Sequence, residues 1–547
     1  MNDLFERAVH HAQHRGAKIA ISKWSPGGVG LVETPYADLL QKARSFAALL
    51  AQLTPSHAML PMLVGKSAES IAAMLGAVAT RRPFCFLNTK CRGPQIAAVL
   101  DATRAPLCLV DAPGLIALKG AWKEHPRITK TTWLIVDATA LSGIYAEAAD
   151  ALRAVARVIE CAGQAPFEWE APPYDQPRPD RAAACLFTSG STGKPKGVLV
   201  SEEDLVRRTE AEISWFGLSE HDVLLSILPF SFDVGLNQLT TALTTGAEIV
   251  LLDSWLPADI LTISERRKVT GISGVPSIWL DMLKSATGFE TGGRHASLRY
   301  ITVSGGSLAV RDFQRLTARL AGIQVFKTYG QTEAFRATSL RPEDSVRKLE
   351  SVGQPFPGTH VYIVGEDATR CRTGEIGEVV HSGLGMMMGY LEDADRHSER
   401  QGKLRENPFR GADDPSPLAI FTGDMGYVDA EGYLYLKGRR DGMVKVMGNR
   451  VYPQEVADQI ATIPGVLEAA VTGLSRADGQ TALVAFLRVP SGATLSVAAV
   501  RKALSAKVPA FMVPSQIVMV DHIPRTASGK PDQRRLVEEL AASGARQ

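Results

Sequence analysis

Hydrophobic residues in the first 330 positions follow two alternating spacings. Helical spacing over Tyr36–Leu53 and Ala68–Ala79 predicts amphipathic helices, and short apolar runs at 59–64 and 83–87 predict buried strands. The alternation continues, with expected strands at 107–111, 132–136, 221–228, 248–252, 271–275, 300–303 and 324–327 and expected helices at 205–215 and 236–245. Such alternation is typical of parallel βαβ units.

The pattern changes twice after residue 355. Short expected strands at 361–364, 377–381 and 432–436, separated by frequent turns, indicate a small β-rich module. Beyond Gly438, expected helices at 453–463 and 496–506 alternate with expected strands at 466–474, 480–488 and 516–520. We therefore predict an α/β protein whose large N-terminal domain, residues 1–440, contains βαβ subdomains and the β-rich module. A hinge joins it to a small α+β C-terminal domain, residues 441–547.

Composition narrows the function classes. A chain of 547 residues is too long for one core, and about two to four domains are expected. The net charge of +2 offers no electrostatic case for binding nucleic acid or an acidic membrane. The six cysteines include no C-x-x-C pair, and we find neither an apolar window of membrane-spanning length nor a signal peptide. We expect reduced thiols and a cytoplasmic protein without a membrane span.

The most informative polar stretch, TSGSTGKPKG at 188–197, lies between two expected strands. Glycines allow close backbone approach, hydroxyls and amides donate to phosphate oxygens, and lysines neutralise their charge. It is not a Walker A loop, because Pro195 follows Lys194 and blocks the helix that such a loop opens. A flexible surface hairpin is the alternative. We predict a phosphate-binding strand–loop–strand with contacts from Thr188, Ser189, Gly190, Ser191, Thr192, Gly193 and Lys196.

This stretch resembles the phosphate loop of the adenylate-forming superfamily, which includes acyl-CoA synthetases, peptide-synthetase adenylation domains and luciferases. Four later segments are similar to further elements of that family, in the family's order. They are YGQTE at 329–333, FTGD at 421–424, the charged run at 438–456, and PRTASGK at 524–530. Residues 1–180 fit the family by layout alone. On these motifs the chain is identified as a member of the superfamily.

The resemblance implies a site for ATP and Mg²⁺. Tyr329 is implied to pack on adenine, Asp424 to bind the ribose, and Glu333 to hold the metal ion. Taken singly these are weak signals, because Tyr-Gly is a common turn and exposed acids are usually solvated. The implied nucleotide contacts besides the phosphate loop are Gly305, Gly306, Tyr329, Gly330, Thr332, Asp424 and Arg439.

The resemblance also divides the reaction into two steps. A carboxylate attacks ATP to give an acyl-adenylate and pyrophosphate, and a thiol then attacks that intermediate and releases AMP. Lys530 is implied to bridge the substrate carboxylate and the α-phosphate, so that Lys530, Glu333 and Thr188 form the catalytic set. The second step requires the C-terminal domain to rotate, and Asp441 is the implied hinge.

The acid pocket is expected near the start of the helix after Phe232. A buried carboxylate needs a cation, so Asp233 favours an amino-acid substrate whose ammonium pairs with it. Two alternatives stay open: Asp233 caps the helix, or Arg336 pairs with it and leaves no free carboxylate. Asn237 and Arg336 suit a small hydrophilic side chain better than a fatty acyl chain. The expected pocket residues are Asp233, Val234, Asn237, Ser273, Gly274, Ser304, Thr328 and Arg336.

The acceptor of the acyl group has two candidates. Only 17 residues follow Lys530, too few for a carrier-protein domain, so we expect the phosphopantetheine thiol of a separate carrier protein or of CoA. The leading hypothesis is activation of an amino acid or small polar acid for such a carrier protein. The alternative is an acyl-CoA synthetase for a short or aryl acid, because the run GLNQ at 235–238 resembles some stand-alone acyl-CoA ligases.

Two other classes are disfavoured. A catalytically inactive relative that only binds a nucleotide or a partner would be expected to have lost some of Lys530, Glu333, Asp424 and Arg439, and all are present. A P-loop kinase or ATPase is excluded by the missing Walker A pattern.

Overall fold

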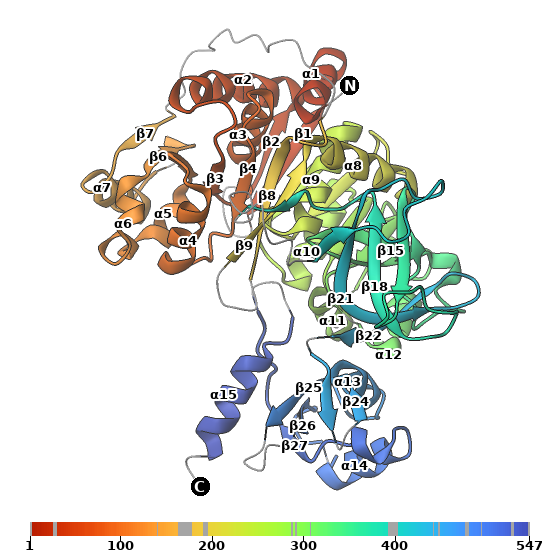
Figure 1. Cartoon of the computed structure of the whole chain (residues 1–547). Helices are drawn as coiled ribbons and strands as arrows, with labels where there is room; N and C mark the ends of the chain where they lie inside the picture. The colour runs from red at the N-terminus through yellow and green to blue at the C-terminus, as the bar shows by residue number, and fades with distance from the viewer. Residues whose placement is uncertain are drawn as a thin grey trace.

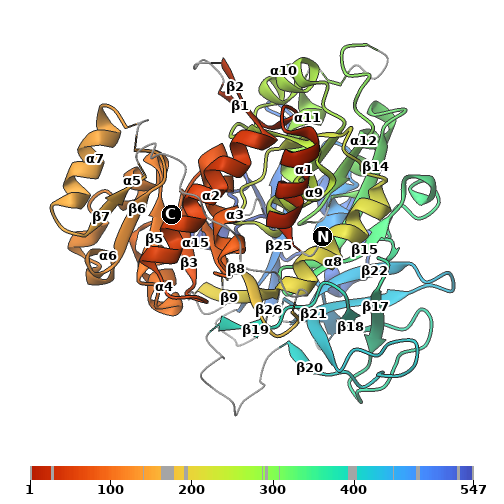
Figure 2. The same ribbon diagram turned by 90° about the horizontal axis from the view of Figure 1, so that it is seen from above.

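The structure is a computed structural model of the chain, shown in Figure 1 and turned by 90° in Figure 2. A large N-terminal part and a smaller C-terminal part are joined near residue 440 (Figure 1). None of the helices described combines the length and the apolar character needed to cross a membrane. The structure describes residues 3–25, 30–138, 141–161, 178–189, 195–285, 288–289, 293–306, 308–391, 403–440, 442–446, 449–475, 481–493, 495–526 and 530–544.

The first subdomain is built on a sheet in the order β19-β9-β8-β4-β3-β5-β6-β7. The strands from β8 to β7 run parallel, whereas β9 pairs antiparallel with both β8 and β19. Its strands are β3 (Leu60–Leu63), β4 (Phe84–Leu87), β5 (Leu107–Val110), β6 (Thr132–Ile135), β7 (Val158–Glu160), β8 (Ala182–Ser189), β9 (Pro195–Ser201) and β19 (Gly389–Tyr390). Its helices are α2 (Tyr36–Leu53), α3 (Ala68–Ala79), α4 (Gly93–Thr103), α5 (Ala112–Leu118), α6 (Pro126–Lys130) and α7 (Ile144–Arg153).

The second subdomain contains a sheet in the order β16-β15-β14-β13-β12-β10-β11-β1-β2. Its central strands run parallel, and their carboxyl ends therefore lie at one edge, where open α/β sheets bind ligands. The strands are β1 (Ile19–Ser25), β2 (Gly30–Pro35), β10 (Val223–Ser226), β11 (Glu248–Leu252), β12 (Gly271–Gly274), β13 (Tyr300–Val303), β14 (Gln324–Gln331), β15 (Ala334–Leu340) and β16 (Gln354–Pro355). The helices are α1 (Leu4–Arg15), α8 (Glu202–Phe216), α9 (Asp233–Thr245), α10 (Pro257–Arg267), α11 (Pro276–Lys284) and α12 (Val310–Arg319).

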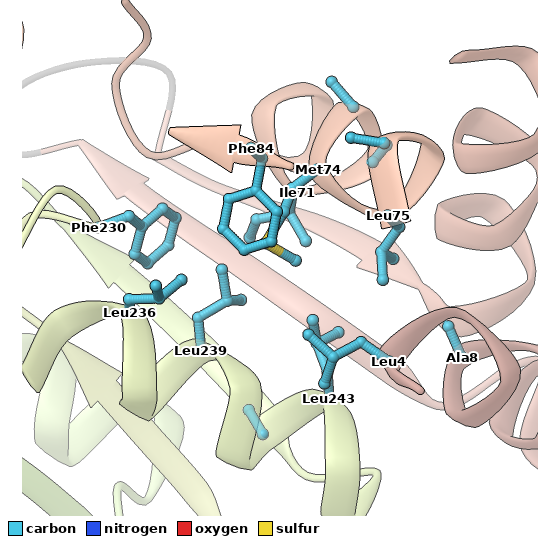
Figure 3. Packing of buried hydrophobic residues seen from close by; sticks show 14 of the residues in the cluster. Leu4, Ala8, Ile71, Met74, Leu75, Phe84, Phe230, Leu236, Leu239 and Leu243 are labelled. Atoms are coloured by element: carbon cyan, nitrogen blue, oxygen red, sulfur yellow. The ribbon is translucent and has the colours of Figure 1, made fainter. Parts of the chain in front are cut away.

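Helices α3 and α9 join the two subdomains. Figure 3 shows the leucines of α9 pointing towards apolar side chains of α3 and β4. Leu236, Leu239 and, across the contact, Met74 are each 0% exposed. Full burial of one such side chain stabilises the fold by about 1.5–3 kcal/mol. This contact therefore fixes the position of α9, the helix that begins at Asp233.

A smaller antiparallel sheet forms the β-rich module, in the order β17-β18-β21-β20 with β22 beside β21. Its strands are β17 (Thr359–Val364), β18 (Gly377–Gly383), β20 (Leu404–Glu406), β21 (Leu418–Val428) and β22 (Leu434–Arg439). The register pairs Asp424 of β21 with Arg439 of β22. The sheet thus brings two of the predicted ribose contacts side by side.

The C-terminal part contains a hairpin, a three-stranded sheet and three helices among its described residues. Arg311 of α12 donates to the Val466 carbonyl at 2.9 Å, and Lys437 pairs with Glu455 at 3.2 Å, so both contacts join the small part to the large one. The elements are β23 (Val444–Val446), β24 (Asn449–Val451), α13 (Pro453–Ala461), β25 (Glu468–Ser475), β26 (Thr481–Arg488), α14 (Val497–Ser505), β27 (Gln516–Met519) and α15 (Gln533–Gly544).

The predicted fold class is confirmed, although several elements were not expected, and two differences bear on the site. β14 does not end at Lys327 but runs through Tyr329, because it pairs with the antiparallel strand β15. β1 pairs in parallel with β11, for example Ile21 with Ile249, although neither strand β1 nor β2 was expected. A pairing so distant in the sequence leaves no signal in local periodicity.

Candidate active site

The polar stretch at 188–197 lies on a hairpin at the end of a parallel strand. β8 and β9 bring Thr188 opposite Lys196, and Thr188 Oγ1 donates to the Lys196 carbonyl at 3.5 Å. The exposed Lys196 places its ammonium 5.2 Å from the ring centre of Tyr390. The two predicted flanking strands are confirmed. Gly190, Ser191, Thr192, Gly193, Lys194 and the side chain of Ser189 lie outside the described residues.

Tyr329, Asp424 and Arg439 meet where the second subdomain contacts the β-rich module. The Tyr329 hydroxyl donates to Asp424 Oδ2 at 2.6 Å, and Gln331 Nε2 donates to the same oxygen at 2.6 Å. Arg439 pairs with the other oxygen, Asp424 Oδ1, at 3.2 Å. Burial and the Asp424 carboxylate raise the pKa of Tyr329 well above its ordinary value, so its ring stays neutral. Residues that the resemblance assigns to adenine and ribose thus form one contact cluster.

Glu333 lies in the turn between β14 and β15 and is 8% exposed. Its Oε1 accepts hydrogen bonds from Lys403 Nζ at 2.8 Å and from the Tyr390 hydroxyl at 2.9 Å. Burial alone would raise the pKa of Glu333, but the Lys403 ammonium and these hydrogen bonds outweigh it and hold that pKa below its usual range. The carboxylate is therefore ionised at neutral pH.

The surroundings of Glu333 fit a magnesium ion shared with a nucleotide. Both contacts are made to Oε1, and Mg²⁺ on a nucleotide takes one or two carboxylates together with phosphate oxygens. No cluster of three or more potential His, Cys, Asp or Glu ligands occurs in the described part of the chain. Lys403 and Tyr390 were missed by sequence reasoning, because neither stands in a pattern that links it to Glu333.

The ends of β13 and β14 contribute hydroxyls to the expected acid pocket. Ser304 Oγ and Thr328 Oγ1 are hydrogen-bonded at 2.5 Å, and Arg336 Nη1 donates to Thr328 Oγ1 at 3.4 Å. Gly305 has φ +80°, and a Cβ there would lie 3.1 Å from the Phe232 ring, so this turn requires glycine. The remaining predicted residues on β12 and α9 are buried: Val234, Asn237, Ser273 and Gly274.

Asp233 is the first residue of α9 and is 8% exposed. Its Oδ1 accepts from the Val234 N–H at 2.8 Å, and its Oδ2 accepts from the Thr332 hydroxyl at 3.2 Å. The capping position belongs to Phe232, so the expectation that Asp233 is the N-cap is wrong. Burial raises the pKa of Asp233, and its hydrogen bonds and two nearby guanidiniums offset this only in part. Within the described residues, no ion pair reaches this carboxylate.

Arg336 pairs with Glu212 of α8 at 3.0 Å, and both side chains are 6% exposed. The alternative in which Arg336 pairs with Asp233 is therefore wrong. Sequence reasoning missed Glu212 and its neighbour Arg208. The spacing of Asp204, Arg208 and Glu212 on one helix face was visible, but alternating charges on a helix usually indicate a solvated face.

Lys530 lies beside Thr526, and residues 527–529 between them are outside the described part of the chain. The Thr526 N–H donates to the Lys530 carbonyl at 2.8 Å, and the backbones of Arg525 and Pro531 form an isolated antiparallel β-bridge. The Lys530 side chain is exposed, and in the described residues no hydrogen bond or ion pair joins it to the large part. In Figure 1 the segment between β27 and α15 extends from the small part towards the large one. Asp441 lies outside the described residues, so its role as the hinge stays a prediction.

Two family models match the chain. The AMP-binding enzyme model matches residues 8–391, and the AMP-binding enzyme C-terminal domain model matches residues 455–530. The chain belongs to the AMP-binding enzyme family. The superfamily inferred from the five motifs is thereby confirmed.

The relatives of this AMP-binding enzyme include a CoA ligase that it matches over nearly its full length and a much larger synthase of which it matches a small part. Over 508 residues it is 29% identical to indoleacetate–CoA ligase of Aromatoleum aromaticum, covering 92% of this chain and 93% of the ligase. Over 361 residues it is 32% identical to bacitracin synthase 3 of Bacillus licheniformis, covering 65% of this chain but 5% of that protein. The chain thus spans about a twentieth of the synthase.

Solved structures share the fold of this chain. ATP-bound MatB from Rhodopseudomonas palustris superposes with a TM-score of 0.79 at 23% identity, covering 99% of each chain. At the level that family membership supports, the protein is an adenylate-forming enzyme that activates an acid with ATP.

Proposed function

We propose that the enzyme activates a small acid that carries an ammonium group, most simply an amino acid. It forms the acyl-adenylate with release of pyrophosphate and then transfers the acyl group to the phosphopantetheine thiol of a separate carrier protein. The observation that carries this proposal is Asp233, a buried carboxylate that no ion pair in the described residues neutralises.

The charges around Asp233 favour a cationic ligand. Arg336 is paired with Glu212, and Arg208 is influenced more by Asp204 than by Asp233. Three carboxylates therefore share two guanidiniums, which stay charged at any ordinary pH. One carboxylate is left without a cation of its own at the edge of the acid pocket, and burial raises the pKa of Asp233. A substrate ammonium stabilises that carboxylate, because a buried charge is costly without a partner.

In this proposal the phosphate-binding hairpin holds the part of ATP that leaves as pyrophosphate. Thr188 and Lys196 donate to its phosphate oxygens, and the remaining loop contacts are those predicted from the sequence. Tyr329 packs on adenine, and Asp424 with Arg439 orients the ribose. Their existing contact cluster supports this role, because it holds three side chains in place before the nucleotide binds.

Glu333 and Lys530 act at the α-phosphate. Mg²⁺ would be held by Glu333 and would supply charge neutralisation on the phosphates. Lys403 keeps Glu333 ionised, and Lys530 reaches from the C-terminal domain, residues 441–547, to the carboxylate and α-phosphate. Asp441 is the proposed hinge between the two half-reactions.

The test compares amino acids with their des-amino analogues in a pyrophosphate-release assay. We expect the wild-type enzyme to prefer the amino acid. Asp233→Asn should lose that preference, because binding of the amino acid weakens by about 2–5 kcal/mol, the usual loss when one partner of a buried charge pair is removed. Asp259→Asn, which removes a partly buried carboxylate in the first turn of α10, is the control. The proposal would be contradicted if every amino acid in the screen released pyrophosphate at the same rate as its des-amino analogue, for example alanine as fast as propionate.

A second candidate is an acyl-CoA synthetase acting on a short or aryl acid. It is favoured by the match to indoleacetate–CoA ligase, which extends over nearly the full length of both chains. The same screen separates the two, because this candidate requires AMP formation from an acid without an amino group and a thioester product with CoA alone.

A further inference from the structure

A buried charged face of α8 lies beside the proposed ammonium site. Asp204, Arg208 and Glu212 follow one another at four-residue intervals, so their side chains lie on one side of the helix. Arg208 and Glu212 are 4% and 5% exposed. The Arg208 guanidinium lies 4.6 Å from the Phe335 ring centre, and its Nε and Nη2 have no hydrogen-bond partner in the described part of the chain. The charges on this face are thus only partly satisfied.

Both the backbone conformation of Arg336 and its ion pair keep its guanidinium beside the charged face of α8. Its φ is +38°, a left-handed conformation that costs a non-glycine residue energy and persists only where the surroundings impose it. A Cβ at Gly330, across the hairpin, would lie 2.4 Å from the Arg336 N atom, so this backbone fits closely against its neighbour. The 3.0 Å pair with Glu212 directs the guanidinium towards α8.

We infer that Glu212 is a specificity-determining positioning residue that reserves Asp233 for the substrate. By pairing with Arg336, it prevents that guanidinium from neutralising Asp233, although Arg336 is near enough to influence the Asp233 carboxylate. Glu212 itself does not touch the substrate. The inference rests on the proposed function, because it explains how the pocket selects an ammonium group.

Glu212→Gln is the first test. It keeps the shape of the side chain but removes its charge, so the Arg336 guanidinium loses its partner and becomes available to Asp233, which it already influences. We expect the ratio of kcat/KM for an amino acid to kcat/KM for its des-amino analogue to fall about tenfold, because a guanidinium beside Asp233 competes with the substrate ammonium. The change should lie in KM for the amino acid, with KM for ATP unaltered. Glu203→Gln, which removes a half-buried carboxylate of the same helix that pairs with Arg207, should leave the ratio unchanged.

The double variant Glu212→Gln/Arg336→Gln distinguishes this role from a merely structural one. It removes both partners, leaves Arg208 with Asp204, and returns Asp233 to its uncompensated state. Replacing both members of a buried pair is better tolerated than replacing one. We therefore expect the double variant to recover the amino-acid preference that the single variant loses, and its far-UV spectrum and melting temperature report whether it folds.

The outcomes separate this inference from the proposed function. A wild-type enzyme without preference for amino acids overturns both. A wild-type preference that survives Glu212→Gln overturns the role of Glu212 alone. Loss in the single variant without recovery in the folded double variant also overturns it, because charge balance then does not explain the loss.

Discussion

At the scale of single residues, ionisation depends on neighbours that come from distant segments. Glu333 and Asp233 are equally exposed, at 8%, yet the pKa of Glu333 is lowered and that of Asp233 is raised. The difference is Lys403, which lies 2.8 Å from Glu333, whereas Asp233 has no such ammonium among the described residues. One carboxylate is thus kept ionised, as the proposed metal ligand requires, and the other is without a cation, as the proposed ammonium site requires.

Lys403→Met should shift the pH dependence of adenylation. Without the ammonium, burial dominates and the pKa of Glu333 rises, so Glu333 becomes protonated at a higher pH than in the wild type. The acid limb of the pyrophosphate-release rate should move to higher pH while the alkaline limb stays in place. Lys348→Met removes a different lysine–carboxylate pair, with Asp429, and should leave the profile unchanged. An unshifted acid limb in Lys403→Met would exclude this role.

At the scale of elements, α9 links the stability of the fold to the geometry of the site. Its leucines pack against α3 and β4 (Figure 3), while Asp233 begins its first turn. Gly235 lets the first turn of α9 pack closely against the preceding loop, because a Cβ there would lie 2.2 Å from the Pro229 carbonyl oxygen. The packing of its leucines therefore sets the position at which α9 begins, at the edge of the expected acid pocket.

Leu239→Ala should destabilise the large part by about 2–5 kcal/mol, because it leaves a cavity between α9 and α3. Leu239 is 0% exposed, whereas Leu256, at 65% exposed, provides the matched control Leu256→Ala. Urea unfolding followed by tryptophan fluorescence measures both. Equal unfolding midpoints for the two variants would contradict the contact described.

At the scale of the whole molecule, the proposed reaction needs residues from both parts of the chain. The predicted nucleotide and acid sites lie in the large part, and Lys530 lies in the small one. Arg311 and Lys437 hold the small part in the observed orientation through Val466 and Glu455. The exposed Lys530 side chain makes no hydrogen bond or ion pair with the large part in the described residues.

Two substitutions should separate the half-reactions. Lys530→Ala is expected to abolish acid-dependent ATP–pyrophosphate exchange but to spare thioester formation from preformed acyl-adenylate, because only the first step builds charge on the α-phosphate. Asp441→Pro is expected to do the reverse by stiffening the hinge. Equal losses in both half-reactions for either variant would remove its assigned role.

Local signals were enough to predict much of the fold. The helices Tyr36–Leu53 and Ala68–Ala79 and the strand Glu248–Leu252 have the bounds expected from periodicity, because their buried faces repeat at regular intervals. The strand β1 was missed, since its stability comes from pairing with β11 rather than from its own pattern. The five motifs placed the nucleotide site in the sequence, because its contacts come from short contiguous runs.

The sequence by itself determined the family and the reaction class and predicted the segments that hold ATP, since glycine-rich and charged motifs carry this chemistry locally. Only the tertiary structure decided how buried charges are paired. It placed Arg336 on Glu212 instead of Asp233, and Lys403 on Glu333. Such pairings depend on distances of a few ångströms between segments far apart in the chain, and Coulomb energy in a buried site changes steeply over those distances.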